Sequence, residues 1–286
     1  MNKAVAGTVF AVTMLVAGSL YATSGSPWSM SNKKVSRSDY VLTSGEDALV
    51  LVPDATAANV GYAEAAQLYL EPSGFDGTAT VFPIPEPSNL VASIPAGVTA
   101  LVQEVESQYT AGDFGDGLNG APEPLYIFGY SEGADVAGLA EQQLYADNIP
   151  TDDLHFVMIG DSASAEGGFL NSFVDSFPQP LQQPLTELLT LLDITAPGLG
   201  ATTPDNLYQT DVYSLTGDGW ANWDGGANIG GLLTDHLEYL GLTPAEIATA
   251  GAPVVDDLTS YYTIDSANVD AFPALWEALM VSLNIS

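Results

Sequence analysis

A serine between two glycines is the first residue of this chain that could do chemistry. It is Ser131, within Gly129-Tyr130-Ser131-Glu132-Gly133. An apolar, β-prone run at residues 125–128 precedes it, and a helix-prone segment follows. A Gly-x-Ser-x-Gly sequence between a strand and a helix is typical of a sharp turn that holds a nucleophilic serine above the sheet. We predict that Ser131 is a nucleophile; the alternative is an ordinary turn whose serine only caps the helix.

Such a serine needs a base, and the chain has only two histidines. His155 lies inside the apolar run 154–157, so we expect it to be structural. His236 comes after the serine and after a glycine-rich loop. In serine hydrolases built on parallel sheets the chain order is serine, acid, histidine. His236 fits this order and is the predicted base.

Four aspartates are candidates for the acid that orients His236: Asp211, Asp218, Asp224 and Asp235. Asp218 lies in a loop just after a predicted strand, at the sheet edge where active sites of such folds lie. Asp211 would come too early, within that strand, and Asp235 adjoins the histidine. Asp218 is therefore the predicted acid, with Asp224 as the main alternative.

The oxyanion of an acyl-transfer reaction needs backbone N–H donors. One is expected from Glu132, the residue after the nucleophile, whose side chain should point to solvent. The other is expected from the loop after the first strand, residues 54–57, where Thr56 is our choice. Neither a cofactor nor a metal is expected, because the acidic pairs at 152–153 and 256–257 lack the spacing of a cation-binding loop.

The elements that must position these residues alternate between strands and helices. The expected strands are 47–53, 79–83, the run before Ser131, 154–159, 210–215 and, as a last strand or a covering segment, 261–264. The expected helices are 60–70, 89–109 with a break or kink at Pro95, the segment from Ser131 to about 147, 229–240, 244–250 and 272–283. This alternation predicts a parallel sheet with helices on both faces. Residues 169–194 are apolar and broken by prolines, and should form short helices that cover the sheet.

The charge distribution is extreme. The four basic residues all lie at or before Arg37, and the 36 acidic residues all lie at or after Asp39. Nothing in the folded part could neutralise phosphates, so nucleic acid is excluded as a partner and anionic membranes should repel the domain. The chain has no cysteine, so stability must come from burial of an apolar core.

The N-terminus has the pattern of a secretory signal peptide. Lys3 precedes an uncharged apolar run, 4–22, and a segment rich in serine and threonine follows. Cleavage is expected after Ser19 or Ala22. An uncleaved anchor is the alternative, because basic residues at 33–37 follow the run. We therefore expect residues 1–38 to be a signal peptide or anchor with a linker, residues 39–286 to be one domain, and the protein to be secreted or in the cell envelope.

Several segments together resemble the PE-PPE domain family of mycobacteria and related actinobacteria, serine α/β hydrolases related to cutinases. The resemblance covers roughly residues 47–280. Its segments are the turn at 128–134, Ile159-Gly160-Asp161 with 166–170, Thr210–Tyr213 with 217–223, His236 with Tyr239, and 261–264. It implies a cutinase-like α/β-hydrolase fold and places Ser131, Asp218 and His236 on the family's triad positions. Two departures stand out: Asn222 replaces an aspartate of the family pattern, and the loop 54–57 lacks the family's glycines.

The resemblance implies an esterase acting on acyl esters, or an acyltransferase between cell-envelope lipids or sugars. A non-catalytic acidic surface protein on a degenerate hydrolase scaffold is a third hypothesis. An apolar substrate group is indicated by the side chains of the covering segment, although ordinary core packing explains them equally well. These side chains are Phe169, Leu170, Phe173, Phe177, Leu181 and Leu185. The sequence does not indicate an oligomeric state.

Overall fold

The computed structural model describes residues 47–53, 60–85, 90–112, 124–184 and 202–283. These residues belong to one compact unit, Ser44–Ser286. The predicted signal peptide or anchor, the boundary at Asp39 and the loop that carries Thr56 lie outside the described residues. Those expectations stay predictions.

The described residues form a seven-stranded sheet in the order β2-β1-β3-β4-β5-β7-β6. All neighbouring strands are parallel except β6, which runs antiparallel to β7. The strands are β1 (Asp47–Pro53), β2 (Thr78–Ile84), β3 (Leu125–Tyr130), β4 (Leu154–Ile159), β5 (Gln209–Leu215), β6 (Val254–Asp256) and β7 (Thr259–Ile264). The sequence did not predict β6, whose three exposed residues carry no pattern of burial.

Both faces of the sheet are covered, which explains the nearly continuous apolar runs of its central strands. Side chains alternate between the faces along β1: Val50 and Val52 join one core cluster, and Leu49 and Leu51 join the other. Two large hydrophobic cores therefore hold the sheet between helical layers.

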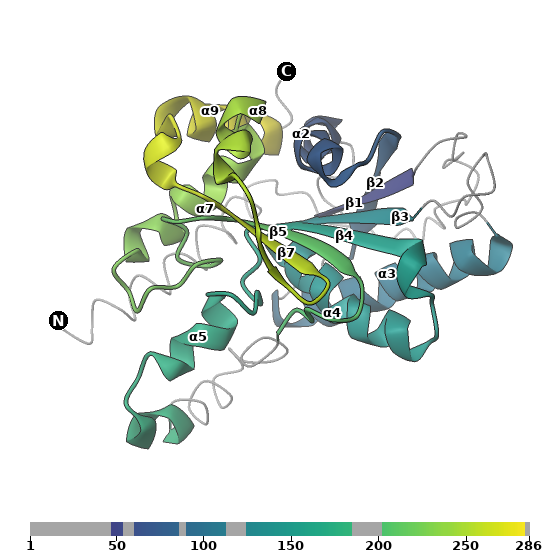
Figure 1. Ribbon diagram of the computed structural model, residues 1–286, viewed down its shortest axis with the longest axis horizontal. Coiled ribbons are helices and arrows are strands. Elements are labelled where there is room, and N and C mark those ends of the chain that lie inside the picture. Colours follow the sequence, from purple (N-terminus) through teal and green to yellow (C-terminus); the bar gives the residue numbers. More distant parts are fainter. Residues whose placement is uncertain (1–46, 54–59, 86–89, 113–123, 185–201, 284–286) are drawn as a thin grey trace, which may run out of the picture. The chain divides into compact units, whose positions relative to one another are not determined.

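The first core lies under α2 (Val60–Leu70), α8 (Pro244–Ile247) and α9 (Ala271–Ser282), and the second under α3 (Leu90–Ala111) and α4 (Glu132–Ala146). Figure 1 shows the first group of helices on one side of the sheet and the second group on the other. The prediction of an α/β-hydrolase fold, a parallel sheet with helices on both faces, is confirmed.

Two helix predictions need correction. Helix α3 continues through Pro95 from Leu90. It packs against α4, and a Cβ on Gly97 would lie only 2.8 Å from a methyl group of Val136. This close packing outweighs the local cost of the proline.

The predicted helix 229–240 is broken into three short pieces, because glycines at 230 and 231 favour helix poorly. The pieces are η5 (Ile229–Leu232), α7 (Asp235–Glu238) and η6 (Tyr239–Gly241). The breaks leave His236 on a single helical turn.

Candidate active site

Ser131 lies in a sharp turn between β3 and α4. Its backbone has φ 54° and ψ −117°, in the region that L residues rarely adopt. The turn is tight enough that a Cβ on Gly129 would lie 2.4 Å from the carbonyl oxygen of Gly133. The Ser131 N–H donates to the carbonyl of Ile159 over 3.0 Å, which ties the turn to the end of β4. Glycine is therefore required at position 129 by the close approach of the two backbones.

The structure brings together the three residues that chain order had selected. Ser131 Oγ lies 2.8 Å from His236 Nε2. On the other side of the ring, His236 Nδ1 lies 2.9 Å from Asp218 Oδ2. The three side chains come from the β3–α4 turn, the short helix α7 and the loop after β5. They form a linear serine–histidine–aspartate arrangement at the carboxyl ends of the strands.

The Asp218 carboxylate is fully buried and held by donors on both oxygens. The backbone N–H of Trp220 donates to Oδ1 over 2.8 Å, and the hydroxyl of Tyr239 donates to Oδ2 over 2.9 Å. The Tyr239 oxygen also accepts the N–H of Leu215 over 2.8 Å. This network fixes the aspartate relative to the last residue of β5.

His236 is positioned from two sides. The Tyr130 hydroxyl, next to the nucleophile in sequence, donates to the backbone carbonyl of His236 over 2.7 Å. On the other side Gly160, at φ 63°, lets the chain pass close to the ring, since a Cβ there would lie 3.1 Å from His236 Cε1. The imidazole is therefore held between the ends of β3 and β4.

Sequence reasoning assigned no function to Tyr130, Tyr239 or the Trp220 backbone. The spacing of His236 and Tyr239, three residues apart, was the available sign for Tyr239, because residues at that spacing share one face of a helical turn. Nothing in the sequence signals the other two contacts.

The other candidate aspartates lie elsewhere. Asp211 Oδ2 lies 3.0 Å from His155 Nε2 within the sheet, so its carboxyl group faces the other histidine of the chain. Asp224 accepts the N–H of Asn228 over 2.9 Å at the surface, and Asp235 accepts the hydroxyl of Thr234. Among the four aspartates weighed, Asp218 is the one that the structure places against His236.

Of the two residues predicted as oxyanion donors, the structure describes Glu132 but not Thr56. Glu132 is the first residue of α4 and follows Ser131 directly. Helix N-termini present N–H groups and a positive end to an anion. Thr56 lies outside the described residues, so the second donor stays a prediction.

An aromatic cluster lies beside the loop that carries Asp218. The Phe169 ring, from α5 (Phe169–Asp175), contacts Trp220 with ring centroids 5.0 Å apart and Trp223 at 5.1 Å. Phe173 stacks on Phe169 at 4.6 Å. Part of the apolar covering segment therefore packs onto the candidate site; Leu185 lies outside the described residues.

Two buried carboxyl groups lie behind the nucleophile, one helical turn along α4 and at the end of β4. Asp135 accepts the Ser162 hydroxyl over 2.9 Å, and Asp161 accepts the Thr203 hydroxyl over 2.7 Å. Burial, and then the neighbouring Asp161, raises the pKa of Asp135 well above its usual range. Burial also raises the pKa of Asp161. The folded protein therefore favours the protonated form of these groups.

A carboxyl whose pKa is raised on folding stabilises the folded state below its ordinary pKa, about 4. That contribution is lost as pH rises through the raised pKa. We expect the melting temperature to fall as the pH rises above about 4, and that of Asp135→Asn to fall less, because an amide carries no charge. The exposed Asp152→Asn should follow the wild type in scans across this range. Parallel curves for Asp135→Asn and the wild type would contradict the prediction.

Replacing Tyr239 by phenylalanine removes one donor to Asp218 and leaves the buried Leu215 N–H without its acceptor. The expected cost is about 1–3 kcal/mol of unfolding free energy. The less stabilised carboxylate should hold a proton on His236 more firmly, so the acid limb of the pH–rate profile should move to higher pH. Tyr145→Phe, at an exposed tyrosine, is the matched control. A loss of stability with an unmoved pH profile would show a purely structural role.

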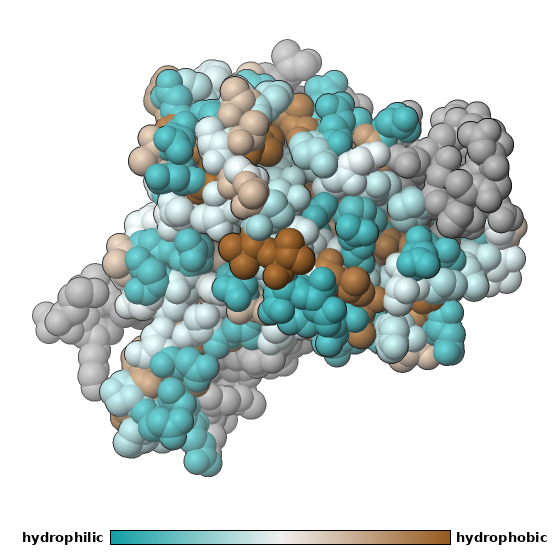
Figure 2. All heavy atoms as spheres, viewed as in Figure 1, coloured by the Kyte–Doolittle hydropathy of each residue, from teal (hydrophilic) through white to brown (hydrophobic). Residues whose placement is uncertain are grey.

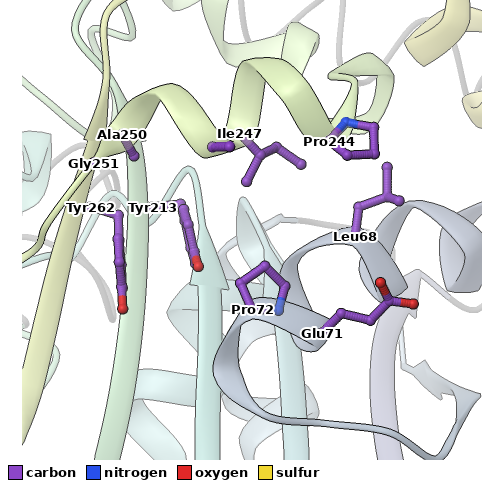
Figure 3. Close-up of a pocket in the computed structure, with 10 residues that line it drawn as sticks. Leu68, Glu71, Pro72, Tyr213, Pro244, Ile247, Ala250, Gly251 and Tyr262 are labelled. Atoms are coloured by element: carbon purple, nitrogen blue, oxygen red, sulfur yellow. The ribbon is translucent and has the colours of Figure 1, made fainter.

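A separate cavity of about 420 Å³ lies between α2, α8 and the strands β5 and β7. Figure 3 shows the rings of Tyr213 and Tyr262 side by side on one wall and Pro72 with Glu71 on another. The two rings stack at 4.5 Å. None of Ser131, Asp218 and His236 lines this cavity.

Two features are absent from the described residues. No helix there has the length and apolar character needed to cross a bilayer. No group of three or more histidine, aspartate or glutamate side chains there is arranged to hold a metal ion.

The covered parallel sheet and the serine–histidine–aspartate arrangement define an α/β-hydrolase-fold protein with a triad-like site. Residues 71–224, more than half of the chain, match the model of the PE-PPE domain. The chain therefore belongs to the PE-PPE domain family.

The chain is similar to the PPE family protein PPE28 of Mycobacterium tuberculosis, with 28% identity over 224 residues. That match covers 71% of this chain but only 29% of the length of PPE28. An extracellular α/β-hydrolase from a Paenibacillus species matches with 16% identity and a TM-score of 0.32, over 82% of this chain and 98% of its own. The type II thioesterase YbtT of the yersiniabactin pathway matches with 14% identity and a TM-score of 0.37, over 90% and 94%.

Proposed function

We propose that this protein is an exported serine esterase that cleaves acyl esters through an acyl-enzyme. The observation that carries the proposal is the hydrogen-bonded series from Ser131 Oγ through His236 to the buried Asp218. Membership of the PE-PPE domain family supports it. Ser131 is the proposed nucleophile, His236 the base and Asp218 the orienting acid.

In the acylation step, Ser131 Oγ attacks the carbonyl carbon of the ester while His236 Nε2 takes the hydroxyl proton. The resulting oxyanion is stabilised by backbone N–H groups, with Glu132 as one donor and Thr56 as the proposed second. When the tetrahedral intermediate collapses, the C–O bond to the alcohol breaks and His236 returns the proton to the leaving oxygen. An acyl-serine remains.

In the deacylation step, His236 takes a proton from water, and the hydroxide oxygen attacks the acyl carbon. When the second tetrahedral intermediate collapses, the bond between the acyl carbon and Ser131 Oγ breaks, His236 returns the proton to Oγ, and the carboxylic acid is released. Asp218 stays ionised throughout, fixes the ring orientation and stabilises the transient imidazolium. The chain has no lysine or arginine after Arg37, so no lysine or arginine side chain of the domain can assist the oxyanion.

Labelling with a fluorophosphonate probe tests this proposal. The wild-type protein is expected to form a stable covalent adduct at Ser131, because the activated oxygen attacks phosphorus as it attacks an ester. Ser131→Ala should remain unlabelled, and Ser107→Ala, on α3, should label like the wild type. A folded wild-type protein that does not react with the probe would exclude the enzyme hypothesis and leave the non-catalytic scaffold.

A further inference from the structure

Helix α9 carries its apolar side chains on the wrong side for an ordinary surface helix. Its inner face is made of Ala274 and Ala278, which are buried. Ala274 lies close to Gly241, where an added Cβ would meet the Ala274 carbonyl oxygen. Four large apolar side chains on the outer side of α9 and at its C-cap are 42–78% exposed. They are Phe272, Trp276, Leu279 and Leu283.

The spacing of these four residues makes a continuous stripe. Successive residues of an α-helix are about 100° apart around its axis, so positions 272, 276, 279 and 283 fall within about 60° of one another. The two buried alanines point to the opposite side. Glu277, the one charged residue of α9, falls on the flank near the packed face. A surface helix normally places its polar residues outward, whereas α9 has an apolar face that no other described part of the chain covers.

The stripe is not isolated from the candidate active site. Helix α9 packs against α7, the turn that carries His236. Leu237 on that turn and Leu233 just before it are also exposed, by 49% and 38%. Figure 1 shows α9 next to α7 and α8, above the sheet. Exposed apolar side chains therefore occur both on α9 and on the neighbouring turn that carries His236.

We propose that the stripe on α9 docks the protein onto an uncharged lipid surface, from which the active site takes its ester substrate. The source of the substrate rests on the proposed function, whereas the docking itself does not. An interfacial helix lies in the plane of the lipid surface with its apolar face a few ångströms deep. Phenylalanine, tryptophan and leucine are the side chains that such faces use.

Charge selects this occupant over the others. Residues 38–286 contain no lysine or arginine and all 36 acidic residues of the chain. A surface of anionic lipids would repel the domain. A second copy would bring two strongly acidic domains together with no basic residue to pair across the interface. An uncharged lipid phase is the apolar partner that carries no such repulsion.

Flotation with an emulsion of trioleoylglycerol, an uncharged ester lipid, tests the proposal directly. The wild-type protein is expected to float with the emulsion, and the double variant Phe272→Ser/Trp276→Ser to bind at least about tenfold more weakly, because burial of each ring contributes at least that factor. Val254→Ser/Val255→Ser is the matched control, since these β6 valines are 67% and 64% exposed. Figure 2 shows a hydrophobic area near the centre of the face that it draws, at the place where Figure 1 labels β7.

Hydrolysis of a soluble short-chain ester separates this inference from the proposed function. The α9 variant should hydrolyse the soluble ester within about twofold of the wild-type rate but lose about tenfold on the emulsion. If no form of the protein hydrolyses either ester, the proposed function fails while flotation still decides the docking surface. The inference is overturned if the α9 variant floats like the wild type, if the wild type does not float, or if sedimentation shows a wild-type dimer that the variant lacks.

Discussion

Replacing His236 by alanine is expected to lower kcat/KM on a soluble ester by about 10⁴-fold or more. The reason is geometric: the Nε2 atom, 2.8 Å from Ser131 Oγ, is the group placed to take the serine proton. The second histidine cannot substitute, because His155 is buried in β4 and paired with Asp211. Steady-state kinetics on purified, folded variants measure the effect.

The combination of His236→Ala with Ser131→Ala makes the test sharper. Residues that act as one catalytic unit are strongly non-additive, so the double variant should be no slower than either single variant. His155→Gln serves as a control for loss of an imidazole and should keep its activity if it folds. Losses that multiply in the double variant would show that the two residues act independently, against the proposed mechanism.

Asp218→Asn is expected to lower kcat by about 10³- to 10⁴-fold. Both oxygens of Asp218 already accept hydrogen bonds, from Trp220 on one side and from His236 with Tyr239 on the other. The amide nitrogen must therefore face a donor whichever way the group is turned. Turned toward His236, it forces the proton onto Nε2, and the ring can no longer accept the proton of Ser131.

Asp224→Asn is the matched control for the acid, because Asp224 follows Asp218 by six residues and lies at the surface. It should keep its activity within about twofold. Thermal unfolding of Asp218→Asn distinguishes the two orientations of the amide. An amide nitrogen that faces the Trp220 N–H would lower the stability of the protein, whereas one that faces His236 would change the tautomer of the imidazole. Greater loss in Asp224→Asn than in Asp218→Asn would identify the other aspartate as the acid.

The fold was largely predictable, because it depends on patterns that are local in sequence. Strands such as β3 and β4 are buried on both faces, so each reads as an uninterrupted apolar run. Helix α2 has the bounds that the sequence predicted, Val60–Leu70. The segment 229–240 was less predictable, because its apolar spacing indicates one helix and does not show that the glycines at 230 and 231 interrupt it.

The candidate site was predictable in part, because the chain offers few residues that could serve as base or acid. Two histidines and a fixed chain order left His236 as the choice, and the position of Asp218 just after a strand favoured it over Asp224. The supporting contacts were not predictable, because they join residues far apart in sequence. Tyr130 and His236 are 106 positions apart, and Ser162 meets Asp135 across two elements. Such pairs are set by how the elements pack.

The absence of lysine and arginine after Arg37 has a practical consequence for detection of the protein. Trypsin cuts after lysine and arginine, and its last site in this chain is Arg37. Complete digestion therefore leaves the whole of Ser38 to Ser286 as one peptide, far outside the size range of routine mass spectrometry. A tryptic survey would miss the domain in a sample where it is abundant. Digestion with a protease that cuts at acidic or aromatic residues would reveal it.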